Sequence, residues 1–343
     1  MASRQRRPAS AKRGGMEFSF DAFVSAIVDD GGQPVFALGD GTLRWGGDIV
    51  REAHDGAILS AARHPSGVGV LTGGDDGRLV WSTRDESREL LNLPGRWIES
   101  LAVSQESGLV AAAAGKTAVV LDTAKPDFRR EFSHSASAAS LSFDAKGRRL
   151  AVATYGGVAL WYARIAEQKP VMLRCAGSHL AVLFSPDGKF VVSAMQEPAL
   201  HGWRLSDGKD MAMSGYQGRV RGMGFAAGGQ WLITAGAPGL VLWPFNGANG
   251  PMGRQALQVD ISLPGLTARL AVDPAGRVVA AASEDGRIAA LDLVHEERKI
   301  VMAEPGGPLA ALAVLETGQV AWGDEAGNAG VVDLADLPAE PPS

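Results

Sequence analysis

Short apolar runs separated by tight polar turns recur along the whole chain. The clearest example is residues 183–203, which read LFSPDGKFVVSAMQEPALHGW. The apolar start ends at the turn formed by residues 185–188, a run rich in β-formers follows, and a third run closes on Trp203. Runs of this length, bounded by Pro, Gly and Asp, are typical of strands joined in hairpins. The pattern therefore predicts short antiparallel strands rather than long helices.

The same unit returns eight times at a nearly constant spacing. From the first-turn glycine of the first copy to that of the last, 318 − 32 = 286 residues are covered in seven steps, or about 41 per step. A period of roughly 40–45 residues with four strands per unit is characteristic of propeller blades. We expect an all-β, single β-propeller of eight blades, with seven blades and one irregular copy as the alternative. The aligned glycines, which number repeats one to eight, are Gly32, Gly67, Gly108, Gly147, Gly188, Gly229, Gly276 and Gly318.

A fourth, less apolar run lies between successive repeats and is expected to form the outer strand of each blade. Examples are residues 48–52, 89–93, 130–132, 171–173, 257–262 and 300–302. The last repeat has no such run after it, because residues 333–343 are short and contain three prolines. Residues 17–20, Glu-Phe-Ser-Phe, have no other place in the pattern. We predict that this N-terminal strand pairs with the last blade and closes the ring, which removes exposed strand edges.

Several segments resemble WD40 repeats, among them SPDGKFVVSA, DDGRLVW, SFDAKGRRLAVATYGGVALW and EDGRIAALDLV. The resemblance covers about residues 17–335 and implies a propeller that serves as a platform for protein interaction. WD40 units often carry a buried His–Ser/Thr–Asp–Trp hydrogen-bond set. Repeat two comes nearest to it with His54, Thr72 and Asp76, although Trp81 falls one residue short of the expected column. Repeat four has His134 and Trp161 but no Asp in its second turn.

Charge and composition divide the chain into three parts. Residues 1–15 carry five basic and no acidic residues, so the net charge of −5 leaves −10 for the rest. We interpret residues 1–15 as a disordered basic leader, residues 16–335 as the propeller and residues 336–343 as a proline-rich tail. An acidic body disfavours specific nucleic-acid binding. An electrostatic tether through the basic leader, to anionic lipid or nucleic acid, stays an alternative.

The same composition bears on cellular location and assembly. The single cysteine, Cys175, excludes an internal disulfide framework and favours a reducing, cytoplasmic location. No apolar run approaches the ~18 residues of a membrane span. We expect a monomeric propeller whose partners are proteins that the sequence does not identify.

Motifs for catalysis or metal binding are not evident. The six histidines form no short ligand cluster of the kind zinc needs, and Asp75-Asp76-Gly77 lacks the alternating ligands and closing Glu of a calcium loop. No nucleophile elbow or phosphate-binding loop occurs. We therefore predict no catalytic, cofactor-binding or metal-binding residue. The rival class is an enzyme similar to the eight-bladed quinoprotein dehydrogenases. Residues 203–209 of this chain superficially resemble the repeat of those enzymes.

Loops that lead into the inner strands are where a partner is expected to bind, because binding residues concentrate on loops held by a rigid scaffold. Eleven residues before each aligned glycine, six of the eight repeats have Gly or Ala. Repeat three has Trp97, which either fills space against the next blade or is an exposed anchor, and Arg96 precedes it. Trp, Tyr and Arg dominate interface hot spots. The full set of predicted interaction residues is Trp97, Arg96, Tyr216, Arg219, Arg221, His179 and Asp21.

Overall fold

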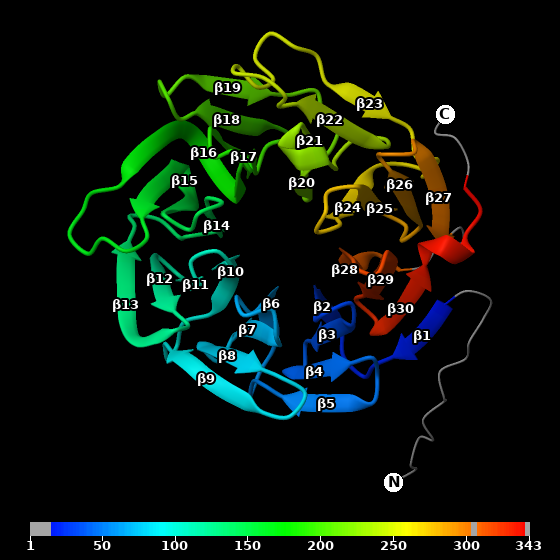
Figure 1. Cartoon of the computed structure of the whole chain (residues 1–343), viewed down its shortest axis with the longest axis horizontal. Coiled ribbons are helices and arrows are strands. Elements are labelled where there is room, and N and C mark those ends of the chain that lie inside the picture. The colour runs from blue at the N-terminus through cyan, green and yellow to red at the C-terminus, as the bar shows by residue number, and fades with distance from the viewer. Residues whose placement is uncertain (1–14, 303–306, 340–343) are drawn as a thin grey trace.

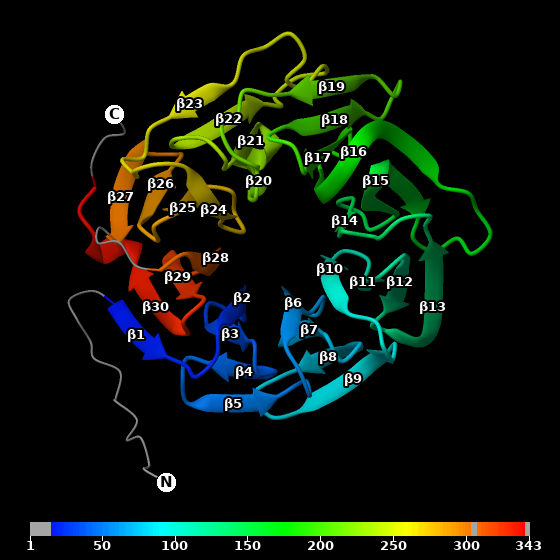
Figure 2. The same ribbon diagram turned by 180° about the vertical axis from the view of Figure 1, so that it is seen from behind.

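Strands radiate around a central axis in the computed structural model, which describes residues 15–302 and 307–339 (Figures 1 and 2). The described part contains thirty strands and two short 3-10 turns, so the expected all-β propeller is confirmed. The first strand of each sheet lies nearest this axis, and the outer strands form the rim. Most strands are four to nine residues long, and most successive strands of a sheet are joined by short turns.

Six of the sheets have four strands each. Repeats one to three are made of β2 (Val24–Asp29), β3 (Pro34–Leu38), β4 (Thr42–Trp45), β5 (Ile49–Glu52); β6 (Ile58–Arg63), β7 (Val70–Gly74), β8 (Arg78–Ser82), β9 (Ser87–Asn92); and β10 (Ile98–Ser104), β11 (Leu109–Ala114), β12 (Thr117–Asp122), β13 (Lys125–Ser133). Repeats six to eight are made of β20 (Met223–Ala226), β21 (Trp231–Thr234), β22 (Leu240–Pro244), β23 (Leu257–Val259); β24 (Thr267–Val272), β25 (Val278–Ser283), β26 (Ile288–Asp292), β27 (Glu297–Met302); and β28 (Leu309–Val314), β29 (Gln319–Asp324), β30 (Asn328–Asp333), with β1 (Gly15–Ser19). The 3-10 turns are η1 (Ala227–Gly229) and η2 (Leu334–Asp336).

Repeats four and five share one six-stranded sheet. Its strands are β14 (Ser140–Phe143), β15 (Arg149–Tyr162), β16 (Val171–Phe184), β17 (Phe190–Met195), β18 (Leu200–Arg204) and β19 (Asp210–Met213). Counted by hydrogen-bonded sheets, the described propeller therefore has seven blades, and the expected count of eight is not confirmed. The reason lies in β15 and β16, which are 14 residues long and continue where other repeats change strands.

The N-terminal strand closes the ring as predicted. β1 pairs antiparallel with β30, from Gly15 opposite Val332 to Ser19 opposite Asn328. The aromatic rings of Phe18 and Phe20 both pack on the fully buried Phe36 of the first repeat, each with a centroid distance of 5.4 Å. The strand thus joins the last sheet by hydrogen bonds and the first repeat by apolar contact.

The ends of the chain lie only partly within the described residues. The predicted basic leader falls outside them except for Gly15, which begins β1. The predicted tail is described only from residue 336, which ends η2, to residue 339. No helix of the described residues is long and apolar enough to cross a membrane.

Apolar clusters fill the seams between neighbouring repeats. Every residue of β11 is buried, and four consecutive alanines in it let the adjacent repeat approach closely. Phe132, Leu141 and Trp161 pack into the same cluster from repeats three and four. The stability of the ring thus comes from burial between neighbouring repeats, in addition to pairing within each sheet.

Candidate protein-binding surface

One face of the ring carries the loops that lead into the inner strands, and we name it the leading face. In repeat three, Ile98 at the start of β10 pairs with Ala114 at the end of β11. The loop before Ile98 and the turn after Ala114 therefore lie at the same end of the sheet. Since the other repeats pair in the same way, each contributes one loop and one turn to this face.

Trp97 is exposed on the leading face. Its side chain is 59% accessible, which resolves the two sequence-based interpretations in favour of an exposed residue. The backbone that carries it is fixed, because the Leu93 amide donates to Gly77 O at 2.8 Å and the Arg96 amide donates to Leu93 O at 3.1 Å. Gly77 is needed here, since a Cβ at this position would lie 2.2 Å from Leu93 O. Trp97 is thus an exposed indole on an ordered loop.

Tyr155 is a second exposed aromatic residue on this face, and sequence analysis did not select it. It lies at the turn inside β15 of repeat four, next to repeat three, and is 70% accessible. The signal available in the sequence was an aromatic residue at a turn position where repeats one and two have Asp.

Tyr216 does not lie on the surface and is a correction to the predicted interaction set. Its hydroxyl is 2.7 Å from Thr234 Oγ1 and accepts a hydrogen bond from Trp243 Nε1 at 2.7 Å. Burial raises the pKa of Tyr216 to about 12, even though both hydrogen bonds act in the opposite direction. Tyr216 stands thirteen residues before Gly229, the position that His54 holds in repeat two, so it belongs to the buried hydrogen-bond set.

His179 is also buried and is a second correction. Its Nδ1 lies 2.7 Å from Ser193 Oγ, and its Nε2 lies 3.1 Å from the carbonyl oxygen of Cys175. Burial lowers the pKa of His179, which favours the neutral ring. With both ring nitrogens occupied inside repeat five, His179 stabilises that repeat and presents nothing to a partner.

The remaining predicted residues stay accessible at the leading face. Asp21, Arg96 and Arg221 are exposed, and Arg219 is half-buried. Arg219 Nη1 donates to Gln196 Oε1 of the neighbouring repeat at 3.0 Å. The prediction therefore placed four polar residues and one aromatic residue on the face, while Tyr216 and His179 lie in the core.

A buried polar set is present in repeat two. His54 Nε2 lies 2.8 Å from Thr72 Oγ1 and its Nδ1 lies 2.9 Å from Asp76 Oδ1. Burial opposes ionisation of Asp76, but hydrogen bonds from Arg78 and His54 outweigh it and lower the pKa of Asp76 to about 2. Trp81 stays outside the set and donates to Val68 O at 3.0 Å. In repeat four, Trp161 Nε1 lies 3.0 Å from His134 Nε2.

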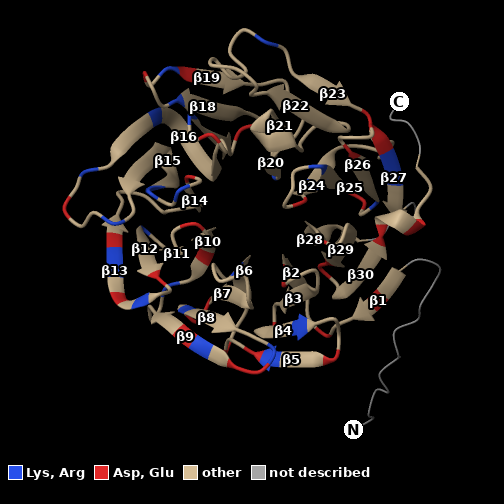
Figure 3. Cartoon of the chain, in the orientation of Figure 1, with Lys and Arg blue, Asp and Glu red and all other residues tan. Residues whose placement is uncertain are grey.

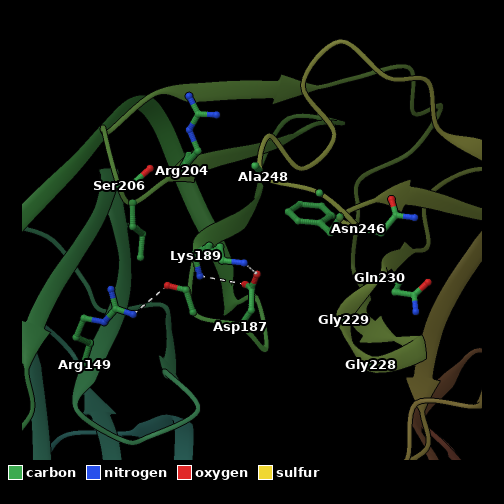
Figure 4. Close-up of a pocket in the computed structure, with 14 residues that line it drawn as sticks. Arg149, Asp187, Lys189, Arg204, Ser206, Gly228, Gly229, Gln230, Asn246 and Ala248 are labelled. Atoms are coloured by element: carbon green, nitrogen blue, oxygen red, sulfur yellow. Dashed lines mark hydrogen bonds and ion pairs between the residues drawn. The ribbon is translucent and has the colours of Figure 1, made fainter.

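The opposite face has a cleft of about 710 Å³ between repeats five and six. Figure 4 shows three basic residues, Arg149, Lys189 and Arg204, on one side and the amides Gln230 and Asn246 on the other. Each basic residue pairs with a carboxylate of its own turn, at 2.8 Å to Asp144, 2.9 Å to Asp187 and 2.6 Å to Asp207 respectively. The cleft therefore carries no excess positive charge.

Metal-ligating residues do not gather elsewhere in the described chain. Over residues 15–302 and 307–339, no group of three or more His, Cys, Asp or Glu side chains is placed to hold a metal ion. His201 and Asp210 form only a pair, at 3.1 Å.

Comparison with known proteins identifies the fold and not the function. No protein-family model and no curated protein matches the chain. By contrast, 1805 chains of solved structures match it. One is the crystal structure of the computationally designed Ika8 protein, with a TM-score of 0.72 and 18% sequence identity over 92% of this chain and 98% of that chain. At this identity, the likeness shows the fold alone.

Proposed function

We propose that the chain is a non-catalytic WD40-like propeller that holds a protein partner against its leading face. The carrying observation is Trp97, a 59% accessible indole on a loop whose backbone is fixed by hydrogen bonds. A large rigid side chain on an ordered loop loses little conformational entropy on binding. Tyr155 on the next repeat extends the aromatic surface, and Arg96 adds a charge-assisted donor beside it. These are the residue types that dominate interface hot spots.

The WD40-like assignment is supported by the polar sets of the repeats. His54, Thr72 and Asp76 make the hydrogen bonds expected of such a set, with the tryptophan left out. Tyr216 takes the histidine position in repeat six and reaches both Thr234 and Trp243. Substitutions that keep a hydrogen bond at the same column favour one ancestral repeat over chance similarity.

We further propose that the ring consists of eight blades, one for each repeat. β15 turns back on itself, since the Ala163 amide donates to Arg148 O at 2.9 Å and Gly156 and Gly157 have φ of 86° and 138°. Val158 and Leu160 of β15 then pack in one buried cluster with Phe184 of β16 and Trp203 of β18. A flat sheet cannot enclose a core of its own. The six-stranded sheet is better understood as two packed blades joined by continuous strands.

We also propose that the protein works in the reducing cytoplasm and that it is a monomer. The lone Cys175 supports the first, because a thiol without a partner is ordinary in a reducing compartment. Closure of the ring by β1 supports the second, since β1 covers the edge of β30, which would otherwise be free to pair with another chain.

Affinity capture with the full-length chain tests the proposal. Native lysate is passed over wild-type protein and over Trp97→Ala. The matched control is Tyr162→Ala, which removes another exposed aromatic residue, 53% accessible, from the rim. We expect Trp97→Ala to lose about ten-fold or more of the captured partner while Tyr162→Ala keeps it. Equal recovery of the same partners by all three proteins would contradict the proposed role of Trp97.

A further inference from the structure

Two arginines from neighbouring repeats lie close together in the sheets' innermost strands or just before them, on the leading face. Arg221 precedes β20 and Arg269 lies near the start of β24, and both strands are the innermost of their sheets (Figure 1). Gly222, next to Arg221, abuts Leu270, next to Arg269: a Cβ at Gly222 would lie 3.0 Å from Leu270 Cβ. The close approach of these two strands therefore brings the backbone of Arg221 beside that of Arg269.

Neither arginine is neutralised by an ion pair. Within the described residues, the ion pairs formed by arginines include neither Arg221 nor Arg269, nor Arg219 beside them. This differs from the opposite-face cleft, in which Arg149 and Arg204 each face a carboxylate. Figure 3 shows basic positions near the inner ends of β20 and β24.

Carbonyl oxygens hold Arg269 in place without cancelling its charge. Its Nε donates to Ala310 O of the next repeat at 3.3 Å, and its Nη1 donates to Ala268 O at 3.4 Å. Burial lowers the pKa of Arg269, and the charge of Arg221 lowers it further, whereas Glu325 raises it. Arg269 is half-buried and has no close counter-ion, so the like charge of Arg221 is unfavourable for it, and an anion that binds between the two removes that cost.

We propose that Arg221 and Arg269, with Arg219 at their side, bind the phosphate of a phosphorylated serine or threonine in a protein partner. The inference rests on the proposed function in that the partner is a protein. A phosphoryl group carries a charge of about −1.5 to −2 and three acceptor oxygens, so it matches two uncompensated guanidinium groups better than one carboxylate does. The fixed Arg269 and the exposed Arg221 supply the planar donors that such a group needs.

Retention of a peptide library on immobilised full-length protein tests this proposal. The library has a fixed central phosphoserine with mixed flanking residues, and the comparison libraries have serine or glutamate at that position. At about 50 mM salt, we expect the phosphorylated library to be retained at least about ten-fold better than the serine library, and less so at about 200 mM. Equal retention of the phosphorylated and serine libraries would overturn the proposal.

Variants locate the site. Arg221→Gln with Arg269→Gln should abolish the preference for phosphate, while Arg277→Gln, an exposed arginine of repeat seven in a turn at the opposite face, should keep it. Glu325→Gln removes the nearest opposing charge without removing a donor, so it should raise retention about two-fold or more. Unchanged phosphate preference in the double variant, or no gain in Glu325→Gln, counts against the site. Retention of anionic phospholipid vesicles in place of the peptides would also contradict it.

Failure of this proposal can be told from failure of the proposed function. Trp97→Ala is expected to keep the preference for phosphate, because Trp97 lies in repeat three and the arginines lie in repeats six and seven. If the lysate capture does not depend on Trp97 but the library result holds, the anion site stands and the aromatic anchor does not. If the reverse is found, only the anion site is lost.

Discussion

Tyr216 shows how one side chain can replace another in a repeat while the hydrogen bonds are kept. In repeat two, an imidazole connects Thr72 to Asp76. In repeat six, a phenol at the same column connects Thr234 to the indole of Trp243. The phenol needs no carboxylate, because its single hydroxyl can donate and accept at once. The absence of an Asp in the second turn of repeat six follows from this chemistry.

Removing the hydroxyl of Tyr216 should destabilise the ring. In Tyr216→Phe, Trp243 Nε1 loses its acceptor and Thr234 loses one partner, and a buried polar group without a partner costs about 1–3 kcal/mol. Urea unfolding measures this loss. The exposed Tyr162→Phe serves as the control, with an expected change within about 0.5 kcal/mol. If both variants unfold at the same urea concentration, the set contributes nothing to stability.

Single residues were the least predictable part of the site. The spacing placed Trp97 in a loop, but its exposure depends on the path of residues 93–97, which is set by the Leu93–Gly77 hydrogen bond. Tyr216 was misassigned because the sequence search looked for histidine at its column. Arg269 was not selected at all, since nothing local in β24 reveals that it lies beside Arg221 of another repeat.

Strands, in contrast, follow closely from the sequence, because each is bounded by turn residues with their own conformational demands. Residues 48–52 and 300–302 were predicted as outer strands and correspond to β5 and to the end of β27. The fusion of repeats four and five was not predicted. It depends on β15 pairing with β16 on both sides of Gly156, from Tyr155 opposite Ser178 to Leu160 opposite Val171, and on β16 having no loop between its two halves. Turn residues predict a change of direction but not whether pairing stops there.

The aromatic residues of β1 should contribute much of the closing energy. Phe18 and Phe20 stack on each other with centroids 6.0 Å apart, and both contact Phe36. Replacing both with alanine should lower the free energy of unfolding by about 3 kcal/mol or more. Met16→Ala on the same strand, where the side chain is 49% accessible, should cost under about 0.5 kcal/mol. Equal urea midpoints for the two variants would contradict a role of these rings in closure.

At the scale of the whole molecule, the ring depends on a contact between the two ends of the sequence. β1 pairs with β30 although more than 300 residues separate them, so this pairing closes a very long loop at an entropic cost. The register places Gly15 opposite Val332, so the start of β1 lies beside the end of β30. The same pairing would therefore suit a strand that follows β30 directly. Only the connection, and not the sheet, would change.

A rearranged chain tests whether closure needs the strand or its position in the sequence. Residues 15–20 are deleted from the N-terminus and attached after residue 339 through a flexible linker of about ten residues. We expect this chain to unfold within about 1 kcal/mol of the wild type, because a loop of this length costs little and every β1–β30 pair can re-form. A chain that lacks residues 1–20 altogether should lose several times more, since it exposes the edge of β30 and uncovers Phe36. If the rearranged chain is as unstable as the shortened one, the N-terminal segment acts before the ring assembles, and pairing with β30 is not the source of its stabilising effect.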